Sequence, residues 1–312
     1  MKRREFFLTG LLGAAALQTM RLPGLGTARA AATSDAFTEP ALSMVKGTDI
    51  AAGVRAAVDA LGGIGTFVRP GDIVFLKPNV SFPNPPEWGS TTHPEVIRAV
   101  VTMCEEAGAK RIIAADFPMR GAERCFEKSG MTALAGSMPQ LTFKQLGEER
   151  DFETVAAPKA SEFREIAVAR LLRKADVFIN LPSAKSHRGT TISMGLKNLM
   201  GLIHDRSSFH GDYDLHTAVA DLAGVIRPQL TILDAHHVLL TNGPGGPGQT
   251  EQLDTIIAGI DPVAVDAAGV RLAEWNNRAG DPAQIRHLAI AAERGIGTLH
   301  IPEEQIVRTN LG

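Results

Sequence analysis

Cysteine is scarce in this sequence: among 312 residues only Cys104 and Cys125 carry a thiol. A four-cysteine iron–sulfur cluster needs four thiolate ligands, so this chain alone cannot hold one. No CxxC pair occurs, and the separation of the two cysteines does not favour a disulfide, which leaves open whether they pair. The scarcity therefore excludes a four-cysteine cluster held by this chain alone, and a CxxC redox motif is absent.

Nucleotide-binding signatures are also missing or weak. The P-loop pattern GxxxxGK[ST] does not occur. Asn242–Gln249, NGPGGPGQ, matches GxGxxG literally, but the following Leu253–Ala258 reads as a strand, whereas a dinucleotide fingerprint opens a helix. Pro244 and Pro247 also remove amide donors that a phosphate cradle uses. We interpret this segment as a loop that lines or covers a site.

The N-terminal apolar run, LTGLLGAAAL, is too short to span a bilayer as a stable helix. It follows the twin-arginine pattern KRREFFL at Lys2–Leu8 and precedes the small-residue site Ala28-Arg29-Ala30. We expect residues 1–30 to be a signal peptide that the twin-arginine translocase recognises during export. The mature protein is then expected in the periplasm or otherwise exported, without stable membrane insertion after cleavage.

Net charge argues against nucleic acid as a partner. The formal charge is −2, and removal of residues 1–30, which hold five basic residues and one acidic residue, changes it to −6. Nucleic acids and anionic lipids repel an acidic protein. Residues 31–45 are mostly small and polar, which indicates a flexible tether. With 44% hydrophobic residues in the chain, residues 46–312 are predicted to form a single domain with a large core.

Short apolar runs alternate with helical patterns along this domain. The runs that read as strands are 72–77, 110–116, 141–143, 176–181, 230–234, 253–258 and, at the end, 305–308. Helical periodicity is clearest at 50–61, 94–107, 166–173, 215–226 and 282–294. The segment 148–159 is acidic and is expected to be irregular surface. The alternation predicts a layered α/β fold with a mostly parallel central sheet flanked by helices.

The segment Asp176–Leu202 concentrates polar groups directly after a predicted buried strand. VFINLP is expected to be that strand and to stop at Pro182, and no acidic residue lies among the cations that follow, up to Lys197. The polar side chains expected at strand ends are Lys77, Asp116, Lys185, His187 and Asp234. Because the carboxyl ends of parallel strands share one edge of a sheet, we expect a ligand site there.

Three motifs, in order, carry a family resemblance. They are LKPN at Leu76–Asn79, DVFINLPSAKSHRGTTISMGLKNLMG from Asp176, and DPVAVD at Asp261–Asp266. Over about residues 46–275 the chain resembles the family called domain of unknown function 362. Some members append a ferredoxin-like module with four-cysteine runs, which this chain lacks. The resemblance implies a binding site and no particular reaction. It also places His216 and Asp221 in a region that faces the segment Asp176–Leu202.

We expect the site to bind a small anion that bears a phosphate or a carboxylate. The residues expected to line it are Lys77, Asn79, Lys197, Asn198, His216, Asp221, Asp234 and Asp266. In an enzyme, Lys185 or His187 would be the general acid or base, because clustered cations lower one another's pKa. Whether the protein is an enzyme, and which cofactor it uses, stays open.

Two other functions also stay open. The export pattern, the iron–sulfur members of the family and three histidines spaced six residues apart from His204 suit a redox- or metal-associated protein. A non-catalytic accessory subunit, exported in folded form, is the third possibility. His216 and Asp221 would point about 140° apart on an ideal helix, so they do not form a helical metal pair. No metal ligand is therefore assigned.

The two acids of DPVAVD are expected to have different roles. Asp261 precedes a proline and a helix, which is typical of a helix cap. Asp266 lies one turn further, among alanine and valine residues, where a carboxylate is unfavourable without a partner. We predict that Asp266 pairs with Lys185, His187 or Lys197 and orients that group.

Overall fold

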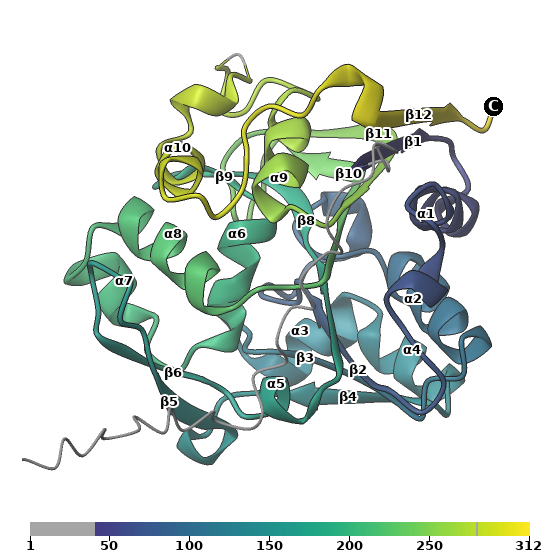
Figure 1. Cartoon of the computed structure of the whole chain (residues 1–312), viewed down its shortest axis with the longest axis horizontal. Coiled ribbons are helices and arrows are strands. Elements are labelled where there is room, and N and C mark those ends of the chain that lie inside the picture. The colour runs from purple at the N-terminus through teal and green to yellow at the C-terminus, as the bar shows by residue number, and fades with distance from the viewer. Residues whose placement is uncertain (1–40, 279) are drawn as a thin grey trace, which may run out of the picture.

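Helices cover both faces of one large sheet in the computed structural model, which describes residues 41–278 and 280–312 (Figure 1). The predicted signal peptide lies outside the described residues. The strands are β1 (Leu42–Lys46), β2 (Ile73–Pro78), β3 (Arg111–Asp116), β4 (Leu141–Gln145), β5 (Phe152–Ala156), β6 (Glu165–Ala169), β7 (Val177–Leu181), β8 (Ser183–His187), β9 (Thr191–Ser193), β10 (Leu230–Leu239), β11 (Thr250–Gly259) and β12 (Ile306–Asn310). The α-helices are α1 (Ile50–Asp59), α2 (Pro94–Glu106), α3 (Ala122–Lys128), α4 (Met131–Ser137), α5 (Leu171–Lys174), α6 (Gly195–Asn198), α7 (Ser207–Gly211), α8 (Leu215–Val225), α9 (Pro262–Val270) and α10 (Arg286–Glu293).

The large sheet has the strand order β12-β1-β11-β10-β7-β2-β3-β4, and β8 pairs with β10 and with β9. From β10 through β7, β2 and β3 to β4, every neighbouring pair is parallel. β11 is antiparallel to both β10 and β1, while β12 is parallel to β1. The prediction of an α/β fold with a mostly parallel central sheet is confirmed.

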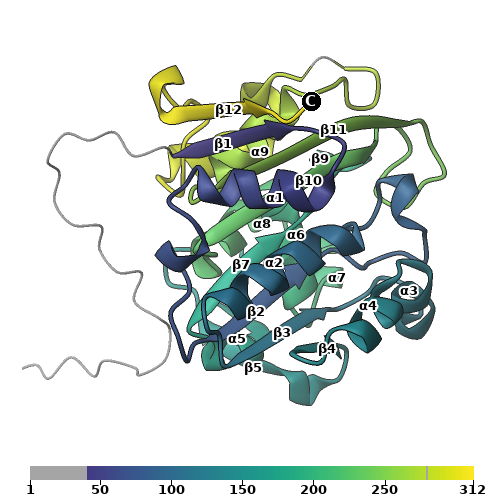
Figure 2. The ribbon, with the colours of Figure 1, turned by 90° about the vertical axis from the view of Figure 1, so that its right-hand side faces the viewer.

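Apolar side chains pack in two clusters, one on each face of the sheet. Figure 2 shows the ribbon of the sheet with α1 and α2 in front of it and α8 and α9 behind it. Helices α1, α2, α3 and α4 contribute to one cluster, and α6, α8, α9 and α10 contribute to the other. Cys104 and Cys125 lie buried in the first cluster as free thiols, and burial raises the pKa of Cys104 to about 12. The second cluster brings α6 and α8 over the strand ends that carry the predicted site.

Two segments differ from the sequence-based expectation. Most of β1 was expected to belong to a tether over 31–45, but Leu42 and Val45 are buried and the strand lies between β11 and β12. Residues 165–169 form β6 in place of the first half of a helix, and β6 pairs with β5 inside the segment expected to be irregular. β1 pairs with strands far along the chain, whereas β6 pairs with the neighbouring β5 across residues 157–164. In both cases the pairing makes the strand, and local propensity does not reveal it.

The strand β7 ends just before Pro182, as predicted, but a second strand begins directly after the proline. The Pro182 carbonyl accepts a hydrogen bond from the amide of Asp234, a contact that needs no N–H from proline. The chain therefore continues as β8, pairs with β10 and returns antiparallel as β9. The polar segment after β7 is for the most part a β-hairpin of β8 and β9, which the sequence analysis did not predict.

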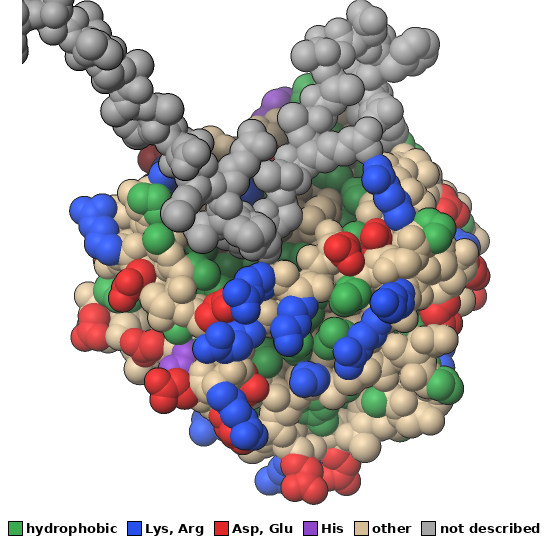
Figure 3. All heavy atoms as spheres, turned by 60° about the horizontal axis from the view of Figure 1, so that its bottom comes forward, with side chains coloured by type: hydrophobic (Ala, Val, Ile, Leu, Met, Phe, Trp, Pro, Cys, Tyr) green, Lys and Arg blue, Asp and Glu red, His purple; other side chains and the backbone are tan. Residues whose placement is uncertain are grey.

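The surface away from this segment carries mixed charge. Figure 3 brings the bottom of Figure 1 forward and shows Lys and Arg side chains in a band across that face, with acidic side chains beside them. Within residues 41–278 and 280–312, no helix has the length and apolar character that crossing a bilayer requires.

Candidate functional site

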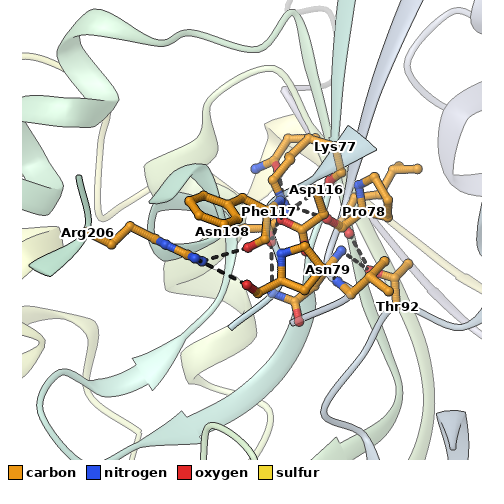
Figure 4. Close-up of polar contacts among 12 residues, drawn as sticks. Lys77, Pro78, Asn79, Thr92, Asp116, Phe117, Asn198 and Arg206 are labelled. Carbon is orange, nitrogen blue, oxygen red and sulfur yellow. Dashed lines mark hydrogen bonds and ion pairs between the residues drawn. The ribbon is translucent and has the colours of Figure 1, made fainter. Parts of the chain in front are cut away.

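A buried ion pair lies at the carboxyl ends of β2 and β3. Lys77 Nζ is 2.8 Å from Asp116 Oδ1, and neither side chain is exposed to solvent. Lys77 Nζ also donates to the Pro78 carbonyl at 2.5 Å, while Asp116 Oδ2 accepts from the Val80 amide at 2.7 Å. Burial lowers the pKa of Lys77, and the attraction of Asp116 opposes that change. Figure 4 shows this pair among its polar contacts, as expected for strand ends that meet at one edge.

Three asparagine side chains connect this ion pair to its surroundings. Asn198 Oδ1 accepts from Lys77 Nζ at 3.2 Å and from Asn79 Nδ2 at 2.9 Å. Its Nδ2 donates to the Lys77 carbonyl at 3.0 Å and to Asn180 Oδ1 at 2.8 Å. One buried amide thus ties α6 to both β2 and β7. A network in which every member has partners holds its parts rigidly.

Gly201 permits this close packing. A Cβ at this position would lie 2.8 Å from Lys77 Nζ, and nearer still to Asp116 Oδ1. Any side chain would therefore displace the ion pair or the short 3₁₀ helix Leu199–Leu202 that carries the glycine.

Lys185 on β8 is buried but well supplied with acceptors. Its Nζ donates to Asn79 Oδ1 at 2.6 Å and to the Ser90 carbonyl at 2.5 Å. It also lies 5.7 Å from the centre of the Phe82 ring. Burial, together with the nearby charges of Lys77 and Lys197, lowers the pKa of Lys185 to about 7, although Asp116 opposes the change.

Lys197 on α6 is also buried, with 8% of the residue exposed, and lacks such acceptors. Among the described residues its Nζ has one hydrogen-bond partner, the thioether of Met200 at 2.9 Å. Burial and then the positive charge of Arg206 lower the pKa of Lys197 to about 7. Arg206 is held in place by the carbonyls of Phe117 and Pro118, at 2.6 and 3.2 Å.

Four histidines lie near Lys197: His187, His210, His216 and His287. We call these four residues together with Lys197 the histidine cluster. The rings of His187 and His210 stack with centroids 6.4 Å apart, and those of His216 and His287 stack at 6.0 Å. His210 is exposed, His187 and His216 are half-buried, and His287 is fully buried. The cluster therefore runs from solvent to the interior.

The histidine cluster is electrostatically unbalanced. Burial, followed by the charges of Lys197 and other cationic groups, lowers the pKa of His187 to about 3. Burial, His216 and Lys197 lower the pKa of His287 to about 3 as well. His187 Nδ1 accepts from the amides of Gly189 and Thr190, at 3.0 and 3.2 Å. In contrast, both ring nitrogens of His287 are buried without a hydrogen-bond partner among the described residues.

Asp266 does not pair with a cation of the site, contrary to the prediction. Its Oδ1 and Oδ2 accept from the amides of Gly195 and Leu196, at 2.6 and 3.0 Å. Burial raises the pKa of Asp266 to about 7, and these two amides oppose the change. The carboxylate therefore holds the start of α6, and it positions Lys197 through the backbone. Asp261 caps α9 as predicted, accepting from Val263 and Ala264.

Two further predicted acids contact other parts of the structure. Asp221 accepts from the amides of Ser161 and Glu162 and from Arg294, so it points away from His216 on α8, as the helical spacing indicated. Asp234 accepts from the amides of His93 and His236. These contacts join loops and strands, and they do not bring either acid to the lysines.

The glycine- and proline-rich loop after β10 lies against β8. The Gly243 amide donates to Ser186 Oγ at 3.0 Å, and the Gly245 carbonyl accepts from Asn84 Nδ2 at 2.8 Å. A Cβ at Gly245 would lie 2.8 Å from the Phe82 ring. The loop thus packs on the strand that carries Lys185.

The structure adds contacts that the sequence did not single out. His287 lies on α10, a hundred residues after Lys185, and its helix has an ordinary amphipathic pattern. Ser90 contributes only a carbonyl, which any residue type provides. Arg206 lies just after the segment Asp176–Leu202, and its positive charge was the one sequence signal available.

Two cavities lie elsewhere, beside β1 and β12. Their volumes are about 280 and 270 Å³, and Met44, Leu272 and Arg308 line both. Neither is lined by a residue of the histidine cluster. Within the described part of the chain, no group of three or more His, Cys, Asp or Glu residues is arranged to hold a metal ion.

Fold and site together define an α/β protein with buried lysines at the carboxyl edge of parallel strands and with histidines beside them that run from solvent to the interior. A family model described as Domain of unknown function (DUF362) matches residues 74–271, and the chain belongs to that family. A thylakoid-associated protein of Synechocystis sp. is 31% identical over 252 residues, which cover 78% of this chain and 75% of the relative.

Two solved structures are also similar. One is the lactate racemase apoprotein from Thermoanaerobacterium thermosaccharolyticum, with a TM-score of 0.45 and 12% identity; the match covers 76% of this chain and 58% of that one. The other is a protein from Thermotoga maritima, with a TM-score of 0.39 and 14% identity; the match covers 67% of this chain and 56% of that one. The family assignment rests on the family model and the Synechocystis relative.

Proposed function

We propose that this protein binds a small anion, bearing a carboxylate or a phosphate, between Lys197 and the histidines around it. The observation that carries the proposal is a buried amine beside a buried imidazole, both without an oxygen partner among the described residues. Buried polar groups are normally hydrogen-bonded, and an unsatisfied one costs about 1–3 kcal/mol. The oxygens of an anion would complete both groups.

The charges around the cluster favour an anion over a cation. The groups that shift the pKa values of Lys197, His187 and His287 are lysine, arginine and histidine side chains, without a carboxylate. An anion between them would accept their hydrogen bonds and favour their protonated forms. In this proposal Lys185 and His187 hold or transfer protons beside the ligand, while Lys77, Asn79 and Asn198 support the site.

Anion-induced thermal stabilisation tests this proposal. We expect phosphate, acetate or citrate to raise the Tm of the wild-type protein and of the control Lys174→Met, whose lysine is exposed. Lys197→Met should lose that response, because it removes the charge while keeping a side chain of similar length. An equal Tm shift in Lys197→Met would reject the site, and comparing the three anions separates phosphate from carboxylate selectivity.

Binding should also take up protons. An anion favours the charged form of Lys197, whose pKa lies at about 7 in the free protein. Affinity should therefore fall about tenfold per pH unit above pH 7. Calorimetric titrations in buffers of different ionisation enthalpy measure the proton uptake, and an affinity that does not change between pH 7 and 9 would contradict the assignment.

We further propose that the protein acts outside the cytoplasm. The support is the twin-arginine pattern at Lys2–Leu8 with the small-residue site Ala28-Arg29-Ala30. Fractionation of a bacterial host should recover a shortened chain in the periplasm, and Arg3→Lys with Arg4→Lys should retain the full-length chain in the cytoplasm. Equal export of this double variant would contradict the proposed route.

A further inference from the structure

Among the described residues three lysines are buried, and Lys197 is the one of these whose amine has no oxygen acceptor within hydrogen-bond distance. Lys77 Nζ is held by Asp116 and by the Pro78 carbonyl, and Lys185 Nζ by an amide oxygen and a backbone carbonyl. Oxygen acceptors stabilise the protonated amine, and the thioether beside Lys197 is a much weaker acceptor. The surroundings of Lys197 thus favour a neutral amine, which is the nucleophilic form.

Two further features suit a nucleophile. Arg206 lies near Lys197, and a neighbouring fixed cation activates a lysine by disfavouring its ammonium form. Arg206 itself stays in place because two carbonyls bind it and its guanidinium lies 3.9 Å from the centre of the Phe117 ring. A fixed positive charge beside the amine would also attract the carboxylate of a ligand.

The histidine cluster supplies proton carriers next to this amine. Both ring nitrogens of His287 and Nδ1 of His216 are buried without partners among the described residues. A neutral imidazole with unengaged nitrogens can accept a proton at one atom and donate one at the other. The half-buried His187 and the exposed His210 extend this series of imidazoles to solvent.

We propose that Lys197 forms a reversible imine with the carbonyl carbon of a small 2-oxo carboxylate. The carboxylate supplies the negative charge of the proposed function, on which this inference rests, and the adjacent carbonyl is the reacting group. Attack by Nζ forms a C–N bond, while the amine loses a proton and the carbonyl oxygen gains one. Loss of water from this carbinolamine then gives the C=N bond, and hydrolysis reverses the sequence.

No oxidant, reductant or second substrate is needed for these steps. An imidazole of the histidine cluster takes the proton that Nζ releases and protonates the departing hydroxyl, so the proton count balances. The imine withdraws electrons from the neighbouring carbon, which is the basis of proton exchange or bond cleavage in lysine-dependent catalysis.

Reductive trapping tests the inference on the full chain. The protein is incubated at pH 7 with pyruvate and sodium cyanoborohydride, and peptides are mapped by mass spectrometry. We expect one reduced adduct per chain, on Lys197. Lactate has the same charge but no carbonyl, and should give none. Lys197→Met, checked for folding by circular dichroism, should give none, whereas the exposed-lysine variant Lys174→Met should react like the wild type.

The outcomes separate this inference from the proposed function. Anion-induced stabilisation without an adduct on Lys197 would overturn the imine and leave anion binding intact. Labelling spread evenly over exposed lysines would overturn it as well, because that pattern reflects general amine reactivity. Absence of both stabilisation and labelling would reject the two proposals together.

Discussion

Partner atoms decide what each buried lysine of this protein contributes. Lys77 has a carboxylate, Lys185 has two neutral oxygens, and Lys197 has a thioether. Burial alone disfavours the charged form of all three, and only a compensating charge or hydrogen bond offsets that cost. Sequence placed the three cations at one site, but their different chemistry depends on side chains from other elements.

Substitution of the two lysines with similar pKa values should change stability in opposite directions. Lys197→Met removes a buried amine without an oxygen partner, and we expect it to raise the free energy of unfolding by about 1–3 kcal/mol. Lys185→Met would leave Asn79 Oδ1 and the Ser90 carbonyl without their donor, at a cost of about 1–3 kcal/mol. Urea unfolding at pH 7 measures both, and a loss of stability in Lys197→Met would contradict this reading of the amine.

The ion pair between Lys77 and Asp116 should contribute more to folding stability than the hydrogen bonds of Lys185 do. Asp116→Ala would leave a fully buried lysine without a carboxylate and the backbone amide of Val80 without an acceptor. We expect a loss of about 3–5 kcal/mol, measured by urea unfolding. Arg98→Ala breaks a solvent-exposed pair with Glu95 and is the matched control, with an expected loss below about 1 kcal/mol.

At the scale of elements, one short helix determines the geometry of the site. α6 presents Lys197 and Asn198 together, and its position is fixed by Asp266 at its start and by Gly201 just beyond its end. The two backbone amides that Asp266 binds require an acceptor at each carboxylate oxygen. An amide side chain offers only one such acceptor.

Substitution of Asp266 by Asn should therefore loosen α6. The Nδ2 of the new amide would face a backbone N–H, and we expect a cost of about 1–3 kcal/mol. Asp261→Ala removes a more ordinary helix cap on α9 and should cost about 1 kcal/mol. Asp266→Asn should also weaken the anion response while Asp261→Ala retains it. Equal anion responses in the two variants would show that the Asp266 contact does not position Lys197.

Several elements could be predicted from local patterns, and others could not. β2, β3 and β7 are short apolar runs with polar residues at their ends, so the strands and the place of Lys77 and Asp116 at strand ends could be predicted from sequence. The ion pair between these two side chains was not predicted. β1, β5 and β6 have weaker patterns: β1 is a strand because distant segments pair with it, and β5 and β6 are strands because they pair with each other. Tertiary pairing overrides local propensity at such positions.

The site was predictable to a similar extent. Lys185, His187 and Lys197 stand out because they lie close together after β7, whereas His287 comes from α10 and has no distinguishing neighbours in sequence. The burial of Asp266 was foreseeable from its apolar flanks, but its partners are backbone amides, which carry no residue-specific signal. Side-chain chemistry marks a site in sequence, and backbone contacts do not.

At the scale of the whole molecule, the buried titratable groups couple stability to pH. Below pH 7 their effects oppose one another: the lowered pKa values of His187 and His287, at about 3, make stability rise with pH, whereas the raised pKa of Asp266, at about 7, makes it fall. Above pH 9 the raised pKa of Cys104, at about 12, again makes stability fall with pH. Between pH 7 and 9 the titration of the buried lysines therefore dominates the dependence of stability on pH.

In that window, stability should rise with pH. Lys185 and Lys197 have pKa values of about 7 in the folded protein against an ordinary 10.5, so between these values the unfolded chain holds more protons. Each amine then adds about 1.4 kcal/mol per pH unit to the free energy of unfolding. Urea titrations at about pH 7.5, 8 and 8.5, near the middle of this window, measure the slope. Lys197→Met should remove about half of it while Lys174→Met leaves it unchanged, and a slope unaffected by Lys197→Met would mean that this amine is charged in the folded protein.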